Sequence, residues 1–359
     1  MSWYTAVKAS GEYEFMNHSV VQPWHISDQD FPSHESSTQK LQFLLNYAVL
    51  APSGHNTQPW KFRLQSETLE LWADLSRALP RVDPNHRELI ISCGAALMNL
   101  RLALHHFGYC GEIQLLPDPT QPTLLAQIQL GDWGHENTED RTLFDAIQKR
   151  HTNRQPFQDW DISETVLKWL QNSAVEEGTW LHLIQSEEER SHILGFVNLA
   201  DHLQMSDPHI RQELADWMHS SHHPNHDGLP AYALGVPEQF DFLTTVLSWL
   251  TRFFDLGNRI AQQDETLLQS ASTIAVLGTD GDTSEHWLRA GQALEKVLLR
   301  AQSLGIVASF FNAPIQMADV RSQLQQSLNR EGYPQVLLRL GYAQPTQSTP
   351  RRSSHDVLF

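Results

Sequence analysis

A pattern of apolar residues with helical spacing occurs twice along the chain. Residues 94–108, GAALMNLRLALHHFG, and residues 291–305, GQALEKVLLRAQSLG, each begin and end with glycine and share Ala-Leu at the third and fourth positions. In both segments apolar residues recur every three or four positions, which predicts two long amphipathic helices. The glycine that closes each segment is typical of a helix C-cap.

The sequence upstream of these two helices also follows a common order. Residues 38–52 and 162–174 have helical periodicity, and Ser163 is the expected N-cap of the second helix. A strand that begins with tryptophan follows each of them, at Trp60 and at Trp180. The order of helix, turn, Trp-led strand and long helix therefore occurs twice, which favours an internal duplication over two unrelated pairs of core helices. Further strands are expected in residues 61–73, as a pair, and 336–340.

Extra sequence at about 187–270 occurs in the second half only. It predicts two or three helices, among them 209–221 and 240–260, joined by a loop rich in Pro and Gly at 222–238. An insertion of this size in one repeat favours a cover, or lid, over a functional site, and a simple packing role is the open alternative. We expect an N-terminal extension, a first half and a second half that carries the insertion, at residues 1–34, 35–140 and 141–359.

Composition and charge indicate which classes of binding partner and which cellular location to expect. The chain has 359 residues, enough for two lobes at about 150 residues per domain. Its net charge of -17 argues against non-specific binding to nucleic acid or to an anionic membrane. No run of eighteen apolar residues predicts a membrane span, and the first fifteen residues do not predict a secretory signal. The two cysteines, Cys93 and Cys110, are typical of a reducing compartment, so we expect a cytoplasmic protein.

Two short segments carry candidate chemistry. In APSGHNTQPWKF, Pro52, Ser53 and Asn56 offer a hydroxyl, an amide and free N–H groups to a planar polar ligand. An ordinary turn is the alternative for Ser53. Arg150 and Arg154 flank Thr152, and in an extended segment these alternate side chains point to one side, which suits a phosphate. The alternative is a solvated basic end of the preceding helix.

These segments, APSGHNTQPW and KRHTNRQPF, resemble the FMN-dependent nitroreductase family, together with RELIISCGAALMNLRLAL, DGLPAYALG and LRLGYAQPTQSTPRR. The likeness covers most of residues 35–359 and is closest to the double-length branch typified by the mycobacterial Acg proteins. The resemblance implies an α+β, nitroreductase-like FMN fold in which two homologous halves are fused as an intramolecular pseudo-dimer.

The resemblance also implies which residues bind the cofactor. In the ordinary dimer, one protomer supplies an Arg-x-Ser/Thr-x-Arg/Lys element and a C-terminal Arg, and the other supplies a Pro-Ser-x-x-Asn turn. The second half of this chain would thus hold the FMN phosphate and ribityl chain, with Arg154 near N1/O2, while the first half closes over the ring. The cofactor-binding residues expected on this basis are Pro52, Ser53, Asn56, Arg150, Thr152, Arg154, Ser309, Arg351 and Arg352.

The two halves complement each other only once. The first half has no Arg or Lys around Trp24, where its own Arg element would lie. The second half replaces the Pro-Ser-x-x-Asn turn with NSAVEEGTW, in which Glu176 and Glu177 would repel an anionic cofactor. We therefore expect one FMN site per chain.

The implied activity is NAD(P)H-dependent reduction of nitroaromatics, quinones or similar planar small molecules through bound FMN, with no catalytic protein residue. The chain has no Gly-x-Gly-x-x-Gly fingerprint, so NAD(P)H would bind transiently over the flavin. A flavin-sequestering storage protein with a closed lid is the main alternative, and a flavin-free interaction protein is a third. A fused pair already contains the usual dimer interface, which favours a monomer and leaves a weak homodimer open.

Histidines are concentrated in the insertion between His202 and His226. Their spacing matches no known ligand signature, so we expect no metal site, and a cluster of His219, His222, His223 and His226 is the alternative. Cys93 is expected to pack as a small apolar residue.

Overall fold

Two antiparallel sheets organise the protein. The computed structural model describes residues 23–359 except residues 66, 135, 235 and 237. The first sheet has the strand order β1-β2-β4-β3 and the second has the order β5-β6-β8-β7. The strands are β1 (Trp60–Gln65), β2 (Thr68–Ala73), β3 (Glu112–Leu115), β4 (Leu124–Gln129), β5 (Trp180–Ile184), β6 (Thr273–Thr279), β7 (Val307–Phe310) and β8 (Tyr333–Gly341).

The strands predicted from the sequence are confirmed. Residues 61–73 form the antiparallel pair β1 and β2, and Trp60 and Trp180 open β1 and β5. Residues 336–340 lie within β8, which begins earlier than predicted. The equivalent order of the two sheets is the pattern that an internal duplication would produce.

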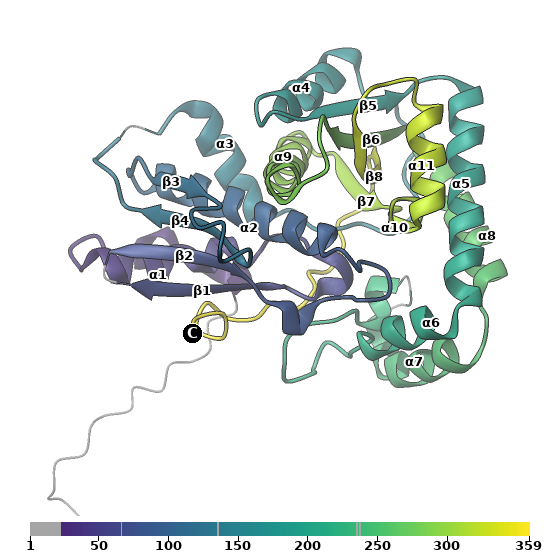
Figure 1. Cartoon of the computed structure of the whole chain (residues 1–359), viewed down its shortest axis with the longest axis horizontal. Coiled ribbons are helices and arrows are strands. Elements are labelled where there is room, and N and C mark those ends of the chain that lie inside the picture. Colours follow the sequence, from purple (N-terminus) through teal and green to yellow (C-terminus); the bar gives the residue numbers. More distant parts are fainter. Residues whose placement is uncertain (1–22, 66, 135, 235, 237) are drawn as a thin grey trace, which may run out of the picture.

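Two long helices, α2 (Arg87–His106) and α9 (Ser284–Ser303), pack against each other in the middle of the molecule, with one sheet on either side (Figure 1). Each helix contributes to the apolar core of the opposite half. Leu288 and Leu299 of α9 lie in the first core, and Ile91 of α2 lies in the second. The two cores are therefore joined through the central helix pair rather than separated by a linker.

Glycines allow the central helices to approach closely. A Cβ atom on Gly94 would lie 2.2 Å from the carbonyl oxygen of Leu288, and one on Gly291 would lie 2.0 Å from that of Ile91. The prediction that these glycines begin the helices is wrong, because both lie inside helices that start earlier. The predicted C-caps are confirmed, since Gly108 and Gly305 follow the helix ends with φ of 85° and 74°.

The remaining helices cover the sheets or connect the strands. The helix α1 begins with a capping box in which Ser36 and Gln39 satisfy each other's backbone N–H groups. Ser163 is the N-cap of α4, as predicted, although its side chain makes no capping hydrogen bond. Outside the insertion, the helices besides α2 and α9 are α1 (Ser37–Ala48), α3 (Thr138–Ile147), α4 (Glu164–Val175), α10 (Ala313–Gln316) and α11 (Ala318–Ser327).

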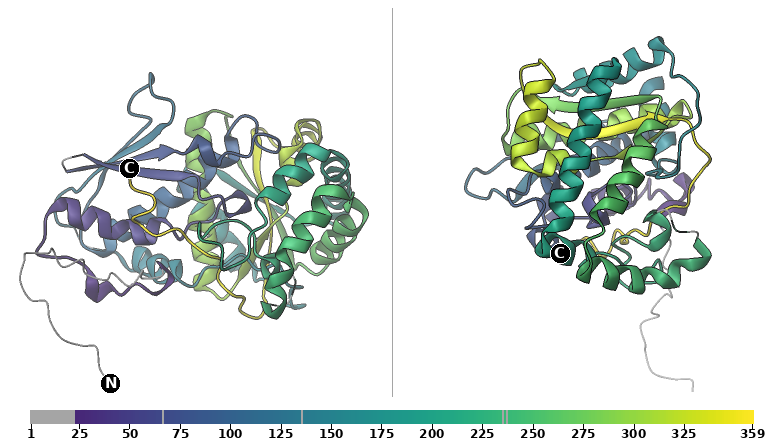
Figure 2. Two further views of the ribbon diagram at one scale, coloured as in Figure 1. Left: turned by 90° about the horizontal axis from the view of Figure 1, so that it is seen from below. Right: turned by 90° about the vertical axis from the view of Figure 1, so that its right-hand side faces the viewer.

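The insertion lies between β5 and β6 and gathers at one end of the molecule (Figure 2). Its described residues form four α-helices, which corrects the prediction of two or three: α5 (Glu187–Ser206), α6 (Pro208–Asp216), α7 (Thr244–Phe253) and α8 (Gly257–Gln269). The predicted helix 240–260 breaks between α7 and α8, where the Asp255 carboxylate accepts a hydrogen bond from the backbone N–H of Gly257. In the first half, by contrast, β1 ends at Gln65 and β2 begins at Thr68.

The C-terminal tail returns from the second half to the first (Figure 1). The backbone N–H of Phe62 in β1 donates to the carbonyl of Val357 at 2.7 Å, and the N–H of Phe359 donates to the carbonyl of Phe62 at 3.0 Å. Val357 is buried in the first core. The tail thereby carries its arginines, Arg351 and Arg352, across to the turn that precedes β1.

The helix α2 is long and apolar enough, by length and composition, to cross a bilayer. However, 83% of its apolar window is buried inside the protein, as expected for a core helix. Cys93 lies in this helix and is fully buried, which confirms its expected apolar packing.

Candidate functional site

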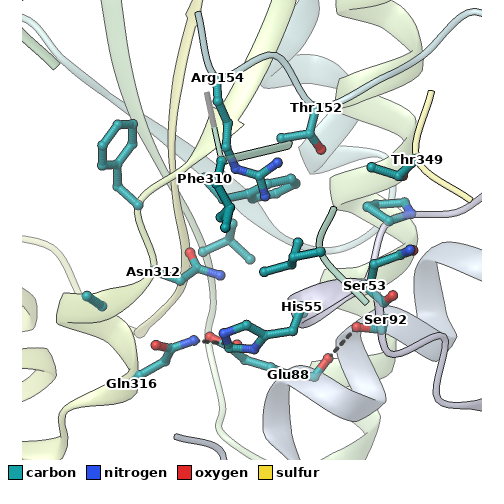
Figure 3. Close-up of a pocket in the computed structure, with 18 of the residues that line it drawn as sticks. Ser53, His55, Glu88, Ser92, Thr152, Arg154, Phe310, Asn312, Gln316 and Thr349 are labelled. Atoms are coloured by element: carbon teal, nitrogen blue, oxygen red, sulfur yellow. Dashed lines mark hydrogen bonds between the residues drawn. The ribbon is translucent and has the colours of Figure 1, made fainter. Parts of the chain in front are cut away.

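A cavity of about 320 Å³ lies where the two halves and the insertion meet. Ligand pockets typically measure roughly 300–1,000 Å³, so this one has the size of a small-molecule site. The turn after α1, the segment after α3, the strand β7, the helices α5 and α8 and the C-terminal tail all contribute to its lining. Figure 3 shows Thr152 and Arg154 on one side of the space and Ser53 and Ser92 on another.

The first half contributes Pro52, Ser53 and Asn56, the three residues expected from the turn motif. The hydroxyl of Ser53 accepts a hydrogen bond from the backbone N–H of Gln58 at 2.9 Å. His55, Asn56 and Gln58 have positive φ of 48°, 54° and 50°. Non-glycine residues rarely adopt this conformation, and such strain concentrates at functional sites. The turn is therefore more constrained than a simple helix-to-strand connection needs.

His55 lies in the same turn and lines the cavity. Its Nδ1 atom is buried and has no hydrogen-bond partner among the described residues. Burial, together with the charge of Arg154, lowers the pKa of His55 to about 4, so the imidazole is neutral near pH 7.

The second half contributes Thr152 and Arg154. Thr152 forms an isolated parallel bridge with Ala308, which extends the segment after α3 alongside β7. Burial lowers the pKa of Arg154, and the carboxylate of Asp264 partly offsets that effect. Asn56 and Thr152, which come from opposite halves of the sequence, line the same cavity.

Arg351 of the C-terminal tail joins the two halves at this cavity. Its Nη1 donates to the side-chain oxygen of Asn56 at 2.8 Å and to the hydroxyl of Thr349 at 2.6 Å. Burial and the nearby charge of Arg150 lower the pKa of Arg351 to about 9. The guanidinium therefore still carries its charge near pH 7.

Three of the expected residues do not line this cavity. The Nε of Arg150 donates to the carboxylate of Glu295 at 3.1 Å and its Nη2 donates to the carbonyl of Leu50 at 2.8 Å. Arg150 pairs with Glu295 of α9 and, together with Thr152, lines a smaller neighbouring cavity. Ser309 is buried in β7, and Arg352 donates to the carbonyl of Gln58 at 3.2 Å. The roles of these three residues toward a cofactor remain predictions.

Three carboxyl groups line the cavity that the sequence did not single out: Glu88 of α2, Asp201 of α5 and Asp264 of α8. Burial raises the pKa of Glu88, and Arg87 beside it opposes that shift. Burial also raises the pKa of Asp201 to about 8 and that of Asp264 to about 6. Glu88 lies in the quoted segment RELIIS, but no motif marks the two aspartates of the insertion.

The loop after α6 covers the turn of the first half. The amide of Gln58 donates to the carbonyl of His226 at 2.9 Å, and that of Asn56 donates to the carbonyl of Gly228 at 3.0 Å. The carboxylate of Asp227 forms an ion pair with Arg77. Leu229 and Leu234 of this loop line the cavity, so it acts as part of the cavity wall.

Two of the insertion's histidines share one carboxylate. The rings of His219 and His223 stack 4.0 Å apart, and the Nδ1 of His219 lies 2.9 Å from the carboxylate of Asp227. One ligand atom from each of these three residues lies within 4.8 Å of the others. Arg77 already pairs with Asp227, which accounts for the buried charge without an ion. The side chain of His222 is 92% exposed and stands apart from this group.

The turn equivalent to Pro52–Asn56 in the second half contains Glu176 and Glu177. Glu177 pairs with Arg101 of α2 at 2.6 Å and with Lys296 of α9 at 3.2 Å, and Glu176 pairs with Lys296 at 2.8 Å. Cations of the central helices thus neutralise both acids. Trp24, at the position without an Arg element, is buried and donates its indole N–H to the carbonyl of Thr349 at 2.9 Å.

Comparison with known proteins identifies relatives over almost the whole length. No protein-family model matches the chain. It is 30% identical over 340 residues to the uncharacterized protein Rv3127 of Mycobacterium tuberculosis, which covers 88% of this chain and 92% of that protein. It is 27% identical over 333 residues to the protein named "Putative NAD(P)H nitroreductase acg" of the same organism, covering 91% and 97%. It is 24% identical over 351 residues to "Probable NAD(P)H nitroreductase PigM" of Serratia sp., covering 90% and 94%.

Two solved structures match part of the chain. One is the FMN and NADPH-dependent nitroreductase NfnB from Sphigopyxis sp. strain HMH, with 15% identity and a TM-score of 0.40. The other is the FMN-dependent nitroreductase NfnB from Mycobacterium smegmatis in complex with NADPH, with 13% identity and a TM-score of 0.40. Each match covers 60% of this chain and 96% of the other.

Proposed function

The chain belongs to the nitroreductase family, in the branch of the mycobacterial acg proteins, and on that premise we propose that it is an FMN-dependent oxidoreductase. It would take electrons from NADH or NADPH and reduce a planar small molecule such as a quinone or a nitroaromatic compound. The observation that carries the proposal is the shared cavity, to which the turn at Ser53 and Asn56 and the segment at Thr152 and Arg154 both contribute.

The groups around the cavity fit FMN. A buried guanidinium is costly unless negative charge compensates it, and a phosphorylated, anionic ligand would add to the charge of Asp264 that already acts on Arg154. Within the described residues, Arg154 donates no hydrogen bond to a carbonyl or a carboxylate, and the Nδ1 of His55 has no partner. Arg154 lines the cavity, so its guanidinium can donate to the polar edge of a flavin or to its side chain. When bound, FMN supplies the two-electron chemistry that these side chains lack.

We assign a role to each residue group in this proposal. Arg154 and Arg351 hold negative charge on the cofactor, because a guanidinium donates rigid, charge-assisted hydrogen bonds. Ser53 and Asn56 orient the polar edge of the ring, and Pro52 packs on its face. The binding roles of Arg150, Ser309 and Arg352 require these side chains to turn toward the cavity when the cofactor binds.

We propose that the two halves, 35–140 and 141–359, form an intramolecular pseudo-dimer with one FMN site. The matched order of the two sheets supports the duplication. The ion pairs of Glu176 and Glu177 support a single site, because they fill the equivalent place with satisfied charges. We further propose a cytoplasmic protein that is active as a monomer, with a weak homodimer as the alternative.

One observation favours a second function, the storage of FMN. The loop after α6 is bonded to the first-half turn through Asn56 and Gln58 and is anchored by the ion pair between Asp227 and Arg77. A cover held this firmly would keep NAD(P)H and acceptor away from a bound flavin. In that case the protein would bind FMN with little or no turnover.

Anaerobic reduction of the FMN-loaded protein separates these functions. NADH or NADPH should bleach the visible absorbance of the flavin within seconds if the protein is a reductase, and an added quinone should restore it. A yellow protein that neither nucleotide reduces would support storage and contradict the reductase. A colourless protein that does not bind added FMN would contradict both and support a flavin-free interaction protein.

A further inference from the structure

Asp201 of α5 is a buried acid that the proposed cofactor site does not use. Its side chain lines the cavity, the residue is 5% exposed, and its Oδ2 atom has no hydrogen-bond partner among the described residues. An unpaired buried carboxyl group costs free energy, so it is retained only where another demand outweighs that cost. Asp201 is contributed by the insertion, which only the second half contains.

The surroundings of Asp201 keep it protonated. The titratable groups that line the cavity are Glu88 of α2, Asp264 of α8, His55, His151, Arg154 and Arg351. Of these, only Asp264 contributes to the shift of Asp201, and its negative charge adds to the effect of burial. The charges of Arg339 and Arg154 act instead on Asp264 and favour its ionised form. The helices α6 and α10 present uncharged Leu214, Ala313 and Gln316 to the cavity.

The neighbouring polar groups do not satisfy Asp201. The amide of Gln204, one turn further along α5, donates to the side-chain oxygen of Gln316 at 2.8 Å. Gln316 in turn donates to the carboxylate of Glu88 at 2.9 Å, as Figure 3 shows. This chain of hydrogen bonds connects α5, α10 and α2 and does not include Asp201. Asp201 itself belongs to the lining of the cavity that a ligand would occupy.

We propose that Asp201 donates a proton to the electron acceptor in the reductase reaction, an inference that rests on the function proposed above. Two-electron reduction of a quinone adds one hydride and one proton. The hydride originates from NAD(P)H and reaches the quinone through the cofactor. A carboxyl O–H bond of Asp201 breaks as an O–H bond forms on the quinone, and the resulting carboxylate regains a proton from solvent.

The two aspartates, Asp201 and Asp264, differ in pKa in the way that this proton transfer requires. With a pKa of about 8 for Asp201 and about 6 for Asp264, the former is protonated and the latter ionised near pH 7. Two carboxyl groups whose environments separate their pKa values commonly divide into an acid and a charged partner. Asp264 is thus a positioning residue that keeps the proton on Asp201.

The first test compares the oxidative half-reaction of variants. The FMN-loaded protein is reduced anaerobically and mixed with a quinone in a stopped-flow instrument between pH 6 and pH 9. For the wild type, the rate of reoxidation should fall as the pH rises through about 8. Asp201→Asn should lower the rate by roughly 10²- to 10⁴-fold, the usual contribution of general acid catalysis, and remove this pH dependence. Reduction by NAD(P)H should be unchanged.

Two further variants separate catalysis from structure. Asp264→Asn should shift the pH dependence to lower pH, because it removes the negative charge that holds the proton on Asp201. Glu188→Gln, an equal change of charge at an exposed position of the same helix, should match the wild type in rate and pH profile. FMN affinity, measured by fluorescence quenching, should be similar in all four proteins.

A second readout requires no turnover. In FMN-free protein, the infrared absorption of protonated carboxylic acids should contain a component that titrates near pH 8, and this component should be absent from Asp201→Asn. The inference is overturned if the infrared signal of Asp201→Asn is the same as that of the wild type. It is also overturned if the rate of flavin reoxidation in the variant equals that of the wild type at every pH. If the wild-type protein does not reduce a quinone with NAD(P)H, the proposed function itself is overturned. That result differs from an active wild type whose rate Asp201→Asn matches, which overturns only the role of Asp201.

Discussion

The side chains that matter most around the cavity are polar groups held in a low-dielectric environment. Arg154, Arg351, His55 and Asp201 all have pKa values shifted by burial toward their neutral forms. Such perturbed groups are concentrated at functional sites because binding and catalysis use the interactions that water would otherwise satisfy. At the scale of single residues, the cavity therefore contains guanidinium groups that can bind an anion and a protonated carboxyl group.

The contribution of Arg154 can be measured directly. Arg154→Ala should weaken FMN binding by roughly 10- to 100-fold, because a hydrogen bond to a charged group contributes about 1.5–3 kcal/mol. Arg63→Ala removes the same charge from β1, away from the cavity, and should leave the affinity unchanged. Titration of FMN by fluorescence quenching measures both. Equal affinity of Arg154→Ala and the wild type would remove Arg154 from the site.

Asp201 should make stability depend on pH in a defined direction. Its pKa rises from 3.8 to about 8 on folding, so the folded chain holds this proton more tightly than the unfolded chain. Between these values the folded state binds more protons, and the free energy of unfolding falls as the pH rises. The Asp201→Asn variant has no such group, so its free energy of unfolding does not fall for this reason. Its stability relative to the wild type should therefore increase from pH 5 to pH 8. Urea denaturation of FMN-free protein tests this, and an unchanged difference would contradict the shift.

The sequence identified part of this site for a physical reason. Ser53, Asn56, Thr152 and Arg154 lie in short segments whose local order already resembles a known cofactor motif. Asp201 lies in an amphipathic helix where an acid is unremarkable, and its burial follows only from the packing of α5 against α8. The side of Arg150 could not be predicted either, because a buried partner on α9, Glu295, determines it.

At the scale of elements, the close contact of α2 with α9 joins the two halves. Periodicity predicted both helices, and the repeated glycines were apparent in the sequence. The sequence could not show that Gly94 and Gly291 allow the two helices to approach closely. A glycine that starts a helix and a glycine at a helix contact cannot be distinguished from the sequence alone. The break between α7 and α8 was missed for a similar reason, because apolar residues continue across it.

The contact between the central helices should be intolerant of a single methyl group. In Gly94→Ala the new Cβ would meet the backbone oxygen of Leu288 at 2.2 Å, and overpacking typically costs about 1–3 kcal/mol. Gly195→Ala is the matched control, since no atom lies within 4 Å of its added Cβ in α5. That change should stabilise the protein by up to about 1 kcal/mol through helix propensity. Urea denaturation should give opposite signs, and a stabilised Gly94→Ala would disprove the tight contact.

The loop after α6 should control how fast a cofactor leaves. Asp227→Asn keeps the size of the side chain but removes the charge that pairs with Arg77 and His219. FMN should then dissociate faster, by about tenfold for each 1.4 kcal/mol lost from the closed form. Asp216→Asn, which breaks an exposed pair with Arg252, should leave release unchanged. Equal rates for the two variants in a fluorescence release assay would show that this ion pair does not hold the cover.

At the scale of the whole molecule, two similar halves differ in what they place at equivalent positions. The tail of the second half crosses to the first, and the insertion of the second half covers the turn of the first. The tail and the insertion complete the cavity beside the first-half turn. At the equivalent position in the second half, ion pairs of Glu176 and Glu177 take its place. The recurring order of helices and strands was apparent in the sequence, whereas the crossing of the tail depends on contacts between distant residues.

The asymmetry predicts one FMN per chain. Native mass spectrometry of the protein with excess FMN should show a single bound flavin, because Glu176 and Glu177 are paired with Arg101 and Lys296 at the second position. Two flavins per chain would mean that these ion pairs open to admit a cofactor.

The central claim is that one flavin is held between groups from both halves of a single chain. A crystal structure of the chain grown with FMN tests this most directly. The account predicts the flavin in the cavity lined by Ser53 and Asn56 on one side and by Thr152 and Arg154 on the other. Flavin bound elsewhere, or in contact with only one half, would contradict it.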